Sequence, residues 1–229
     1  NKIIKKVIDI LLWLSIVLLT YLCITSILGP VRFEKIREQR EKAVIQRLVE
    51  IRKAEVEYKN QNGKYTASFD TLFQFIKTAK KKRVIKEGTL TDKQLKSGLT
   101  EAKAAEIVRR GNKMEILEKG LAHFRRDTVE VSLLKELFPN YSEENIEKMC
   151  IIPYSRNEKF ELKVNNNYTN ASGIRIPLFE AAAPYESYLY DLDRHELLNL
   201  IDKAENENKF PGLKVGSIIE PNNNAGNWE

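Results

Sequence analysis

The sequence predicts an α+β protein: a long N-terminal transmembrane helix continues into an amphipathic helix, packed on a small, mainly antiparallel sheet with extra short helices. Three observations predict this class. Residues 10–31 form an uncharged apolar run, residues 33–61 repeat apolar side chains with a helical period, and short β-branched runs follow residue 127. The 229 residues, 42% hydrophobic and 31% charged, suffice for an anchor and a domain with its own core.

The apolar run at residues 10–31 has the length needed to cross a bilayer. A helix rises about 1.5 Å per residue, so the run covers roughly 33 Å, close to the hydrocarbon thickness. A charged residue at a helix centre costs about 2.5–3.5 kcal/mol on insertion, and the run contains none. A cleaved signal peptide is the alternative, but its apolar region spans only about 7–15 residues and ends in a small-residue cleavage site. We therefore expect residues 1–31 to be a retained anchor.

Four residues in or beside the run are candidate contacts with neighbouring membrane helices. Asp9 lies about one turn inside the expected membrane surface, where a carboxylate is costly unless a partner pairs with it. An interfacial carboxylate beside the preceding lysines is the alternative. Trp13 suits the headgroup region, whereas Tyr21 is too central for that and is interpreted as facing a partner helix. Gly29 permits close helix approach, and the proline after it is expected to end or kink the helix.

Residues 32–79 are expected to form a charged juxtamembrane amphipathic helix and a second, short helix. The apolar stripe of the first helix recurs at spacings of three and four and consists of Val44, Leu48, Ile51, Ala54 and Tyr58. Gly63, which follows Asn62, is expected to end the first helix, because glycine adopts the left-handed conformation without a steric penalty. Ser68 is expected to cap the short helix. The apolar side of that helix carries Phe69, Leu72, Phe73 and Ile76.

The first third of the chain, roughly residues 1–76, resembles type IV pilins and pseudopilins. A short basic N-terminus and a membrane helix run into an amphipathic helix that ends in residues 54–65 (AEVEYKNQNGKY), followed by a Ser-Phe-Asp-Thr-Leu turn. Two family features are absent: the processing motif and the glutamate at the fifth mature position, for which Asp9 is a displaced substitute. The resemblance implies a long helix packed on a small sheet outside the cytoplasmic membrane, without establishing a fibre.

Residues 80–126 are predicted to be a basic, helical insertion. Six of the ten residues in 77–86 are Lys or Arg. The basic strip is defined as Lys80, Lys81, Lys82, Arg83 and Lys86. We interpret it as part of a solvated loop, with contact to acidic lipid headgroups or an acidic partner as the alternative. Nucleic acid is disfavoured because no aromatic residues are interleaved. Further along, Thr100 is expected to cap a helix that ends at Gly111. Its inward side chains are expected to be Ala102, Ala105 and Val108.

Residues 127–229 are expected to form a strand-rich extracytoplasmic domain. The predicted strands are residues 128–133, 149–154, 159–164, 174–179, 185–190 and 213–218. Asp193 is expected to cap a helix that runs to about Ala204. Trp228, in a polar tail, is expected to pack on its own domain, with docking to a partner as the alternative.

No motif in the sequence predicts catalysis or a cofactor. His195-Glu196 opens like a zinc-binding His-Glu-x-x-His helix, but Asn199 stands in the place of the second histidine. No phosphate-binding glycine loop and no nucleophile elbow is present. Thr71 and Thr128 lie in Asp-Thr-aliphatic triplets, which resemble the short O-glycan acceptor of the Bacteroidota periplasm. We therefore expect a non-enzymatic protein without a cofactor, with these two threonines as candidate O-glycan acceptors.

Charge favours a cytoplasmic C-terminal part only weakly, because three lysines precede the apolar run and five Lys or Arg follow it by residue 42. The resemblance implies a single-pass protein of the bacterial inner membrane with its C-terminal domain in the periplasm. We expect a structural or assembly subunit of a membrane protein complex. Its partners would be the lipid bilayer and other membrane or periplasmic proteins, in a homo- or hetero-oligomer. The alternatives are an accessory subunit of an inner-membrane transport or motor complex, and a membrane-anchored enzyme or glycan-binding module.

Overall fold

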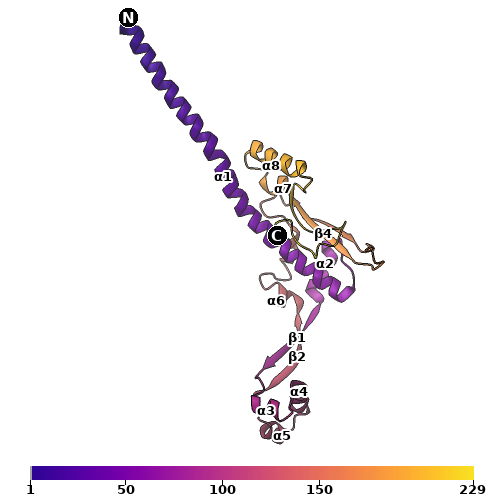
Figure 1. Cartoon of the computed structure of the whole chain (residues 1–229). Helices are drawn as coiled ribbons and strands as arrows, with labels where there is room; N and C mark the ends of the chain where they lie inside the picture. Colours follow the sequence, from indigo (N-terminus) through magenta and orange to yellow (C-terminus); the bar gives the residue numbers. More distant parts are fainter. Residues whose placement is uncertain (1) are drawn as a thin grey trace. The chain divides into compact units, whose positions relative to one another are not determined.

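A computed structural model describes residues 2–229, apart from the side chains of residues 2, 3, 25, 84, 127 and 128 (Figure 1). Its elements in chain order are α1 (Lys2–Asn62), α2 (Phe69–Thr78), β1 (Lys80–Glu87), α3 (Asp92–Lys96), α4 (Glu101–Arg110), α5 (Lys113–Glu118), β2 (Arg125–Ser132), α6 (Leu133–Leu137), the 3₁₀ helix η1 (Ile146–Cys150), β3 (Glu161–Asn165), β4 (Leu178–Pro184), α7 (Tyr185–Leu189), α8 (Arg194–Asn206) and β5 (Gly212–Gly216). Two compact units result: unit 1 (Asn1–Phe75 and Glu144–Glu229) and unit 2 (Ile76–Glu143). The chain is therefore an α+β protein, as the sequence predicts.

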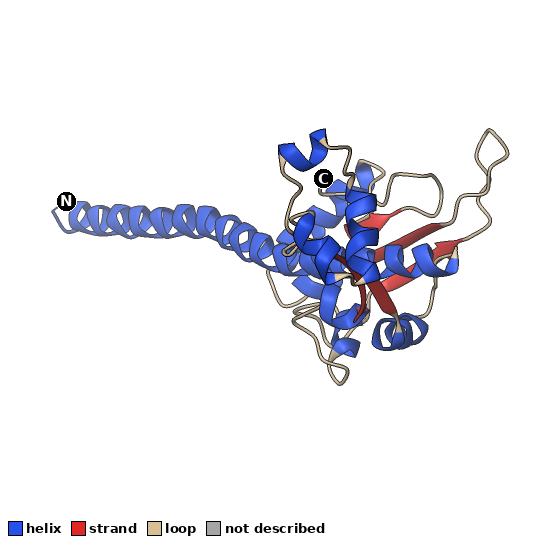
Figure 2. Ribbon diagram, turned by 90° about the horizontal axis from the view of Figure 1, so that it is seen from below, coloured by secondary structure: helices blue, strands red, loops and turns tan. Residues whose placement is uncertain are grey.

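Helix α1 is a single helix of 61 residues that joins the apolar run to the sheet of unit 1. It continues through Pro30, so of the two predicted effects of this proline, an end or a kink, the end is wrong and the kink stays a prediction. A proline inside a helix removes one backbone hydrogen bond, which the remaining bonds of so long a helix tolerate. Figure 2 shows the N-terminal part of α1 as a rod free of the blue helices and red strands that surround its other end. The apolar run and the stretch that packs on the sheet thus belong to one continuous helix.

The C-terminal half of α1 forms the core of unit 1, and its predicted apolar stripe is confirmed except at Tyr58, which is only partly buried. Val44, Leu48, Ile51 and Ala54 are all 0% exposed. They lie in the part of α1 that packs on β4 and β5. The sheet has the order β3-β4-β5 with antiparallel neighbours, and Ala181 of β4 pairs with residues of both other strands. An extended run of buried apolar positions in β4 suits its central place.

Two strands predicted in unit 1 are wrong. The segment 185–190 forms helix α7, which buries Tyr188 and Leu189. The segment 149–154 begins in η1 and contains only an isolated bridge between Ile151 and Lys159. Short apolar runs do not distinguish a buried strand from a buried helical turn, which explains both errors. The helix after Asp193 is confirmed, since the Asp193 carboxylate accepts hydrogen bonds from the first turn of α8.

Unit 2 is a two-stranded antiparallel ribbon, β1 with β2, that carries helices α3, α4 and α5 at one end (Figure 1). These helices enclose a small core. Its buried members are Leu99, Ala104, Ile107, Leu121 and Phe124. The cap at Thr100 and the stop at Gly111, with φ of 73°, are confirmed. The inward face of α4 is displaced from the expected one, because Ala104 and Ile107 are buried whereas Ala102 is exposed.

The interpretation of the basic strip as a loop is wrong, because all five of its residues lie in strand β1. Pairing with β2 supplies the backbone hydrogen bonds, and β2 is a β-branched run of the kind that favours strands. This pairing places β2 in unit 2, whereas the sequence suggested a domain beginning at residue 127. The paired residues of β1 and β2 lie between 38 (Glu87 and Arg125) and 52 (Lys80 and Ser132) positions apart in the chain, too far for a local sequence pattern to predict the pairing.

Candidate functional site

The apolar half of α1 is exposed along its whole length. Every described side chain from Ile4 to Val31 is exposed, with Trp13 at 69% and Ile27 at 67%. This helix is long and apolar enough to cross a membrane. Contiguous apolar surface of this extent marks contact with lipid or with other proteins. The folded chain leaves this surface to be covered from outside, which makes the segment the principal candidate functional site.

Two hydroxyl groups in this segment are satisfied within the helix. The Ser15 hydroxyl donates to the carbonyl oxygen of Leu11 at 2.9 Å, and the Thr20 hydroxyl donates to that of Ile16 at 2.8 Å. Such bonds reach back one turn and leave no donor unpaired in a medium without water. These two hydroxyl groups therefore need no partner outside the helix.

The helix does not bring all four candidate contact residues to one face. Successive residues turn by about 100°, so Asp9 and Trp13 lie within about 40° of each other. Tyr21 lies about 120° from Asp9, and Gly29 lies close to the opposite side. A Cβ added at Gly29 would meet no atom within 4 Å, so this glycine is not required by packing within the chain. Asp9 and Trp13 thus define one face of the helix, and Tyr21 and Gly29 lie on others.

Sequence reasoning missed two residues on the Asp9 face. Thr20 and Cys23 follow Asp9 by 11 and 14 residues, spacings that return to the same side of a helix. Both side chains are small, which allows a second helix to approach closely. The signal that identifies them is the helical spacing from Asp9. The Asp9 face is defined here as Asp9, Trp13, Ile16, Thr20 and Cys23.

Beyond the apolar segment, Arg40 fastens α1 to the segment after α7. Its guanidinium donates to the Asp191 carboxylate at 2.5 and 2.8 Å and to the carbonyl oxygen of Tyr188 at 2.7 Å. It also lies over the Tyr154 ring, 5.2 Å from the centroid. The hydrogen bond from Arg40 lowers the pKa of Asp191. A bidentate pair fixes orientation as well as distance, so α1 holds its domain in one arrangement.

Residues near the end of the sequence contact the C-terminal half of α1 through Arg52. Arg52 donates to the carbonyl oxygen of Asn224 at 3.1 Å and to the Glu229 carboxylate at 2.7 Å. The same segment forms a bridge between Gly226 and Val215 of β5. Trp228 is half-buried, and its ring occupies the space that a Cβ at Gly226 would need. The prediction that Trp228 packs on its own domain is confirmed.

Glu55 is a buried carboxyl group on the α1 core face that sequence reasoning missed. It is 0% exposed, and its Oε2 accepts a hydrogen bond from the backbone of Thr66 at 3.2 Å. Its Oε1 has no hydrogen-bond partner among the described residues. Burial raises the pKa of Glu55 to about 8. The signal was available, since Glu55 follows Ile51 by four residues and Leu48 by seven, both on the buried stripe.

The basic strip does not form one cationic face. Alternate residues of a strand point to opposite sides, so Lys80, Lys82 and Lys86 lie on one side of the ribbon and Lys81 and Arg83 on the other. Acidic residues offset part of the charge: Lys80 lies 3.6 Å from Glu130, and Arg83 lies 3.2 Å from Glu136. The strip is therefore a mixed ribbon surface.

The two candidate O-glycan acceptors lie in different units. Thr71 is exposed in the first turn of α2. Thr128 lies in β2, and its side chain is outside the described part of the structure. Among the described residues, no group of three or more His, Cys, Asp or Glu is placed to hold a metal ion.

Comparison of the chain with protein-family models, with curated proteins and with solved structures gave no match. The resemblance to type IV pilins therefore stays a hypothesis drawn from residues 1–76.

Proposed function

We propose that this protein is a non-enzymatic, single-pass subunit of a membrane protein complex in a bacterial envelope, with its pilin-like domain in the periplasm. One observation carries the proposal. The same uninterrupted helix has every described side chain exposed from Ile4 to Val31 and one fully buried apolar face from Val44 to Ala54. Such a helix transmits the position of the membrane segment to the domain without a flexible linker.

The Asp9 face supports a subunit role rather than a simple tether. A tether needs only an apolar surface toward lipid, whereas a carboxylate within the span is costly unless a neighbour pairs with it. Asp9 shares its face with the small side chains of Thr20 and Cys23, which suit close approach of a second helix. The Arg40 and Arg52 contacts then present the sheet at a fixed orientation to neighbouring proteins.

Purification of the full chain from native membranes in mild detergent tests this function. We expect it to migrate in an assembly well above the 26.5 kDa of one chain, with further copies or other membrane proteins. Asp9→Asn should reduce the assembled fraction severalfold, because it removes the charge that a neighbour pairs. The control Glu38→Gln makes the same carboxylate-to-amide change at an exposed site on α1 outside the apolar segment. Recovery of the wild-type protein as a monomer would contradict the proposal.

A further inference from the structure

The charge of this chain is divided unevenly between its two units. Unit 2 contains 16 Lys and Arg against 10 Asp and Glu, which accounts for the whole net charge of +6, and unit 1 is neutral. Within unit 1, residues 186–207 contain seven Asp and Glu against two Lys and Arg. That acidic segment consists of α7, the turn after it and α8. The chain thus carries a basic and an acidic surface on different units.

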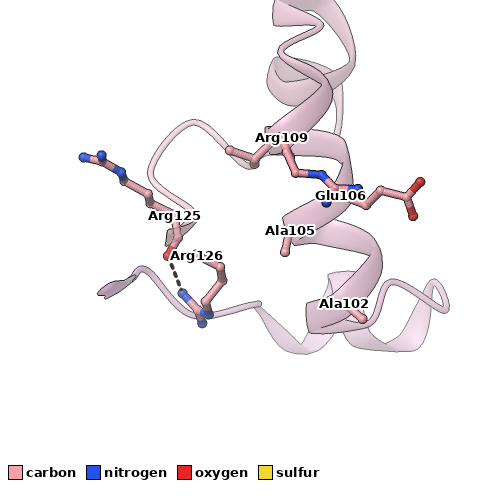
Figure 3. Close-up of a pocket in the computed structure, with 7 residues that line it drawn as sticks. Ala102, Ala105, Glu106, Arg109, Arg125 and Arg126 are labelled. Atoms are coloured by element: carbon pink, nitrogen blue, oxygen red, sulfur yellow. Dashed lines mark hydrogen bonds between the residues drawn. The ribbon is translucent and has the colours of Figure 1, made fainter. Parts of the chain in front are cut away.

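The basic unit contains a groove with an apolar floor. The groove, of about 690 Å³, lies between α4 and the start of β2. Its lining residues are Ala102, Ala105, Glu106, Val108, Arg109, Arg125 and Arg126. Figure 3 shows Ala102 and Ala105 on the helix side of the opening and the two arginines of β2 across from them. This α4–β2 groove therefore combines small apolar side chains with three arginines and one carboxylate, Glu106, a net positive lining.

Arg126 makes the strand side of the groove rigid. Its guanidinium donates to the carbonyl oxygens of Glu87 at 2.9 Å and Gly88 at 3.1 Å, and it lies 4.2 Å from the centroid of the Phe124 ring. A salt bridge of 3.3 Å links it to Glu101 at the start of α4. Both walls of the groove are thus held together before any ligand arrives, which lowers the entropy cost of binding.

Helix α8 has the complementary surface. Leu198, Asp202 and Glu205 are spaced by four and three residues and lie on one side of α8. All three are exposed, with Leu198 at 40%. The two carboxylates lie in the C-terminal half of the helix, where the helix dipole adds further negative potential. An apolar side chain beside two carboxylates matches a small apolar floor beside arginines.

We propose that α8 of one copy docks in the α4–β2 groove of a second copy. Leu198 then packs on Ala102 and Ala105, while Asp202 and Glu205 pair with Arg109 and Arg125. The two surfaces differ, so the contact is heterologous and can repeat from copy to copy. The inference rests on the proposed function as an assembly subunit and adds how copies recognise one another. The acidic surface within the same chain favours a second copy over an anionic lipid as the occupant.

A charge-swap experiment on the full chain in mild detergent tests this contact. One variant, R109E/R125E, makes the groove rim acidic, and a second, D202R/E205R, makes the face of α8 basic. Each variant alone should dissociate at least tenfold more readily than the wild-type chain in sedimentation velocity at about 50 mM salt, where charge pairs are little screened. An equimolar mixture should recover association, because each altered surface then meets one of opposite charge.

The control K93E/K96E carries the same change in net charge on α3, outside the groove, and should associate as the wild type does. Recovery in the mixture also shows that both variants are folded. A mixture that stays dissociated would overturn the inference. So would a result in which only the groove variant R109E/R125E fails to associate and the same variant also loses binding to anionic vesicles. If all variants assemble equally, this contact alone is wrong. A wild-type chain that is monomeric in native membranes would overturn the proposed function as well.

Discussion

Replacing Glu55 with glutamine is expected to remove most of the pH dependence of folding of unit 1. Burial raises the pKa of the Glu55 carboxyl from 4.5 to about 8 in the folded protein. Between these pH values the folded state holds a proton that the unfolded state has lost. The contribution of Glu55 to the stability of the wild type is therefore fully present below about pH 4.5, and it is lost as the pH rises toward 8. A shift of this size corresponds to a loss on the order of 5 kcal/mol.

Glutamine has no proton to lose, and its side-chain oxygen still accepts the hydrogen bond from Thr66. Denaturant unfolding in detergent at pH 5 and pH 8.5 measures the difference. We expect the free energy of unfolding to fall with pH in the wild type and to change much less in Glu55→Gln. The control Glu50→Gln, whose carboxylate lies 3.4 Å from Arg47, should retain the wild-type slope. An identical slope in wild type and Glu55→Gln would mean that Glu55 is not buried as described.

Leu48→Ala is expected to lower the free energy of unfolding by about 2–5 kcal/mol, because it leaves a cavity in a core that cannot fully collapse. Leu48 is 0% exposed in the part of α1 that packs on the sheet. The control Gln46→Ala lies two residues away on the exposed side of α1 and should change stability by about 0.5 kcal/mol or less. Urea unfolding of both variants, followed by circular dichroism, supplies the comparison. Equal effects would contradict the assignment of this stripe to the core.

The sequence predicts α1 well, because a period of 3.6 residues in apolar side chains is a local signal. That signal also locates the buried stripe, and the preference of helix starts for Thr and Asp locates the caps at Thr100 and Asp193. Strand β1 was missed because clustered lysines normally indicate solvated coil, and its stability comes from a partner strand far along the chain. Helix α7 was missed because its run is too short to show a period.

The residues of the candidate site likewise differ in whether a local sequence pattern predicts them. Asp9 and Trp13 were found as a charge and an aromatic residue at the edge of an apolar run, and helical spacing then places them on one face. The ion pair between Arg40 and Asp191 joins residues 151 positions apart, so no local sequence pattern predicts it. The α4–β2 groove likewise depends on how β2 packs beside α4. The exposed apolar segment is thus predictable from the sequence alone, whereas the contacts that fix the domain to the same helix come from tertiary structure.

The most direct test of the account uses the native thiol of Cys23 and a membrane-impermeant maleimide. Cys23 lies in the exposed apolar segment of α1, whereas Cys150 is buried. Ser172→Cys adds a thiol at an exposed site in the loop between β3 and β4. In intact spheroplasts we predict labelling of Ser172→Cys at the rate of a free thiol, and labelling of Cys23 only after the protein is denatured in detergent. Labelling of Cys23 in intact membranes as fast as Ser172→Cys would contradict a lipid-embedded segment. Absence of labelling at Ser172→Cys would place the C-terminal domain on the cytoplasmic side of the membrane.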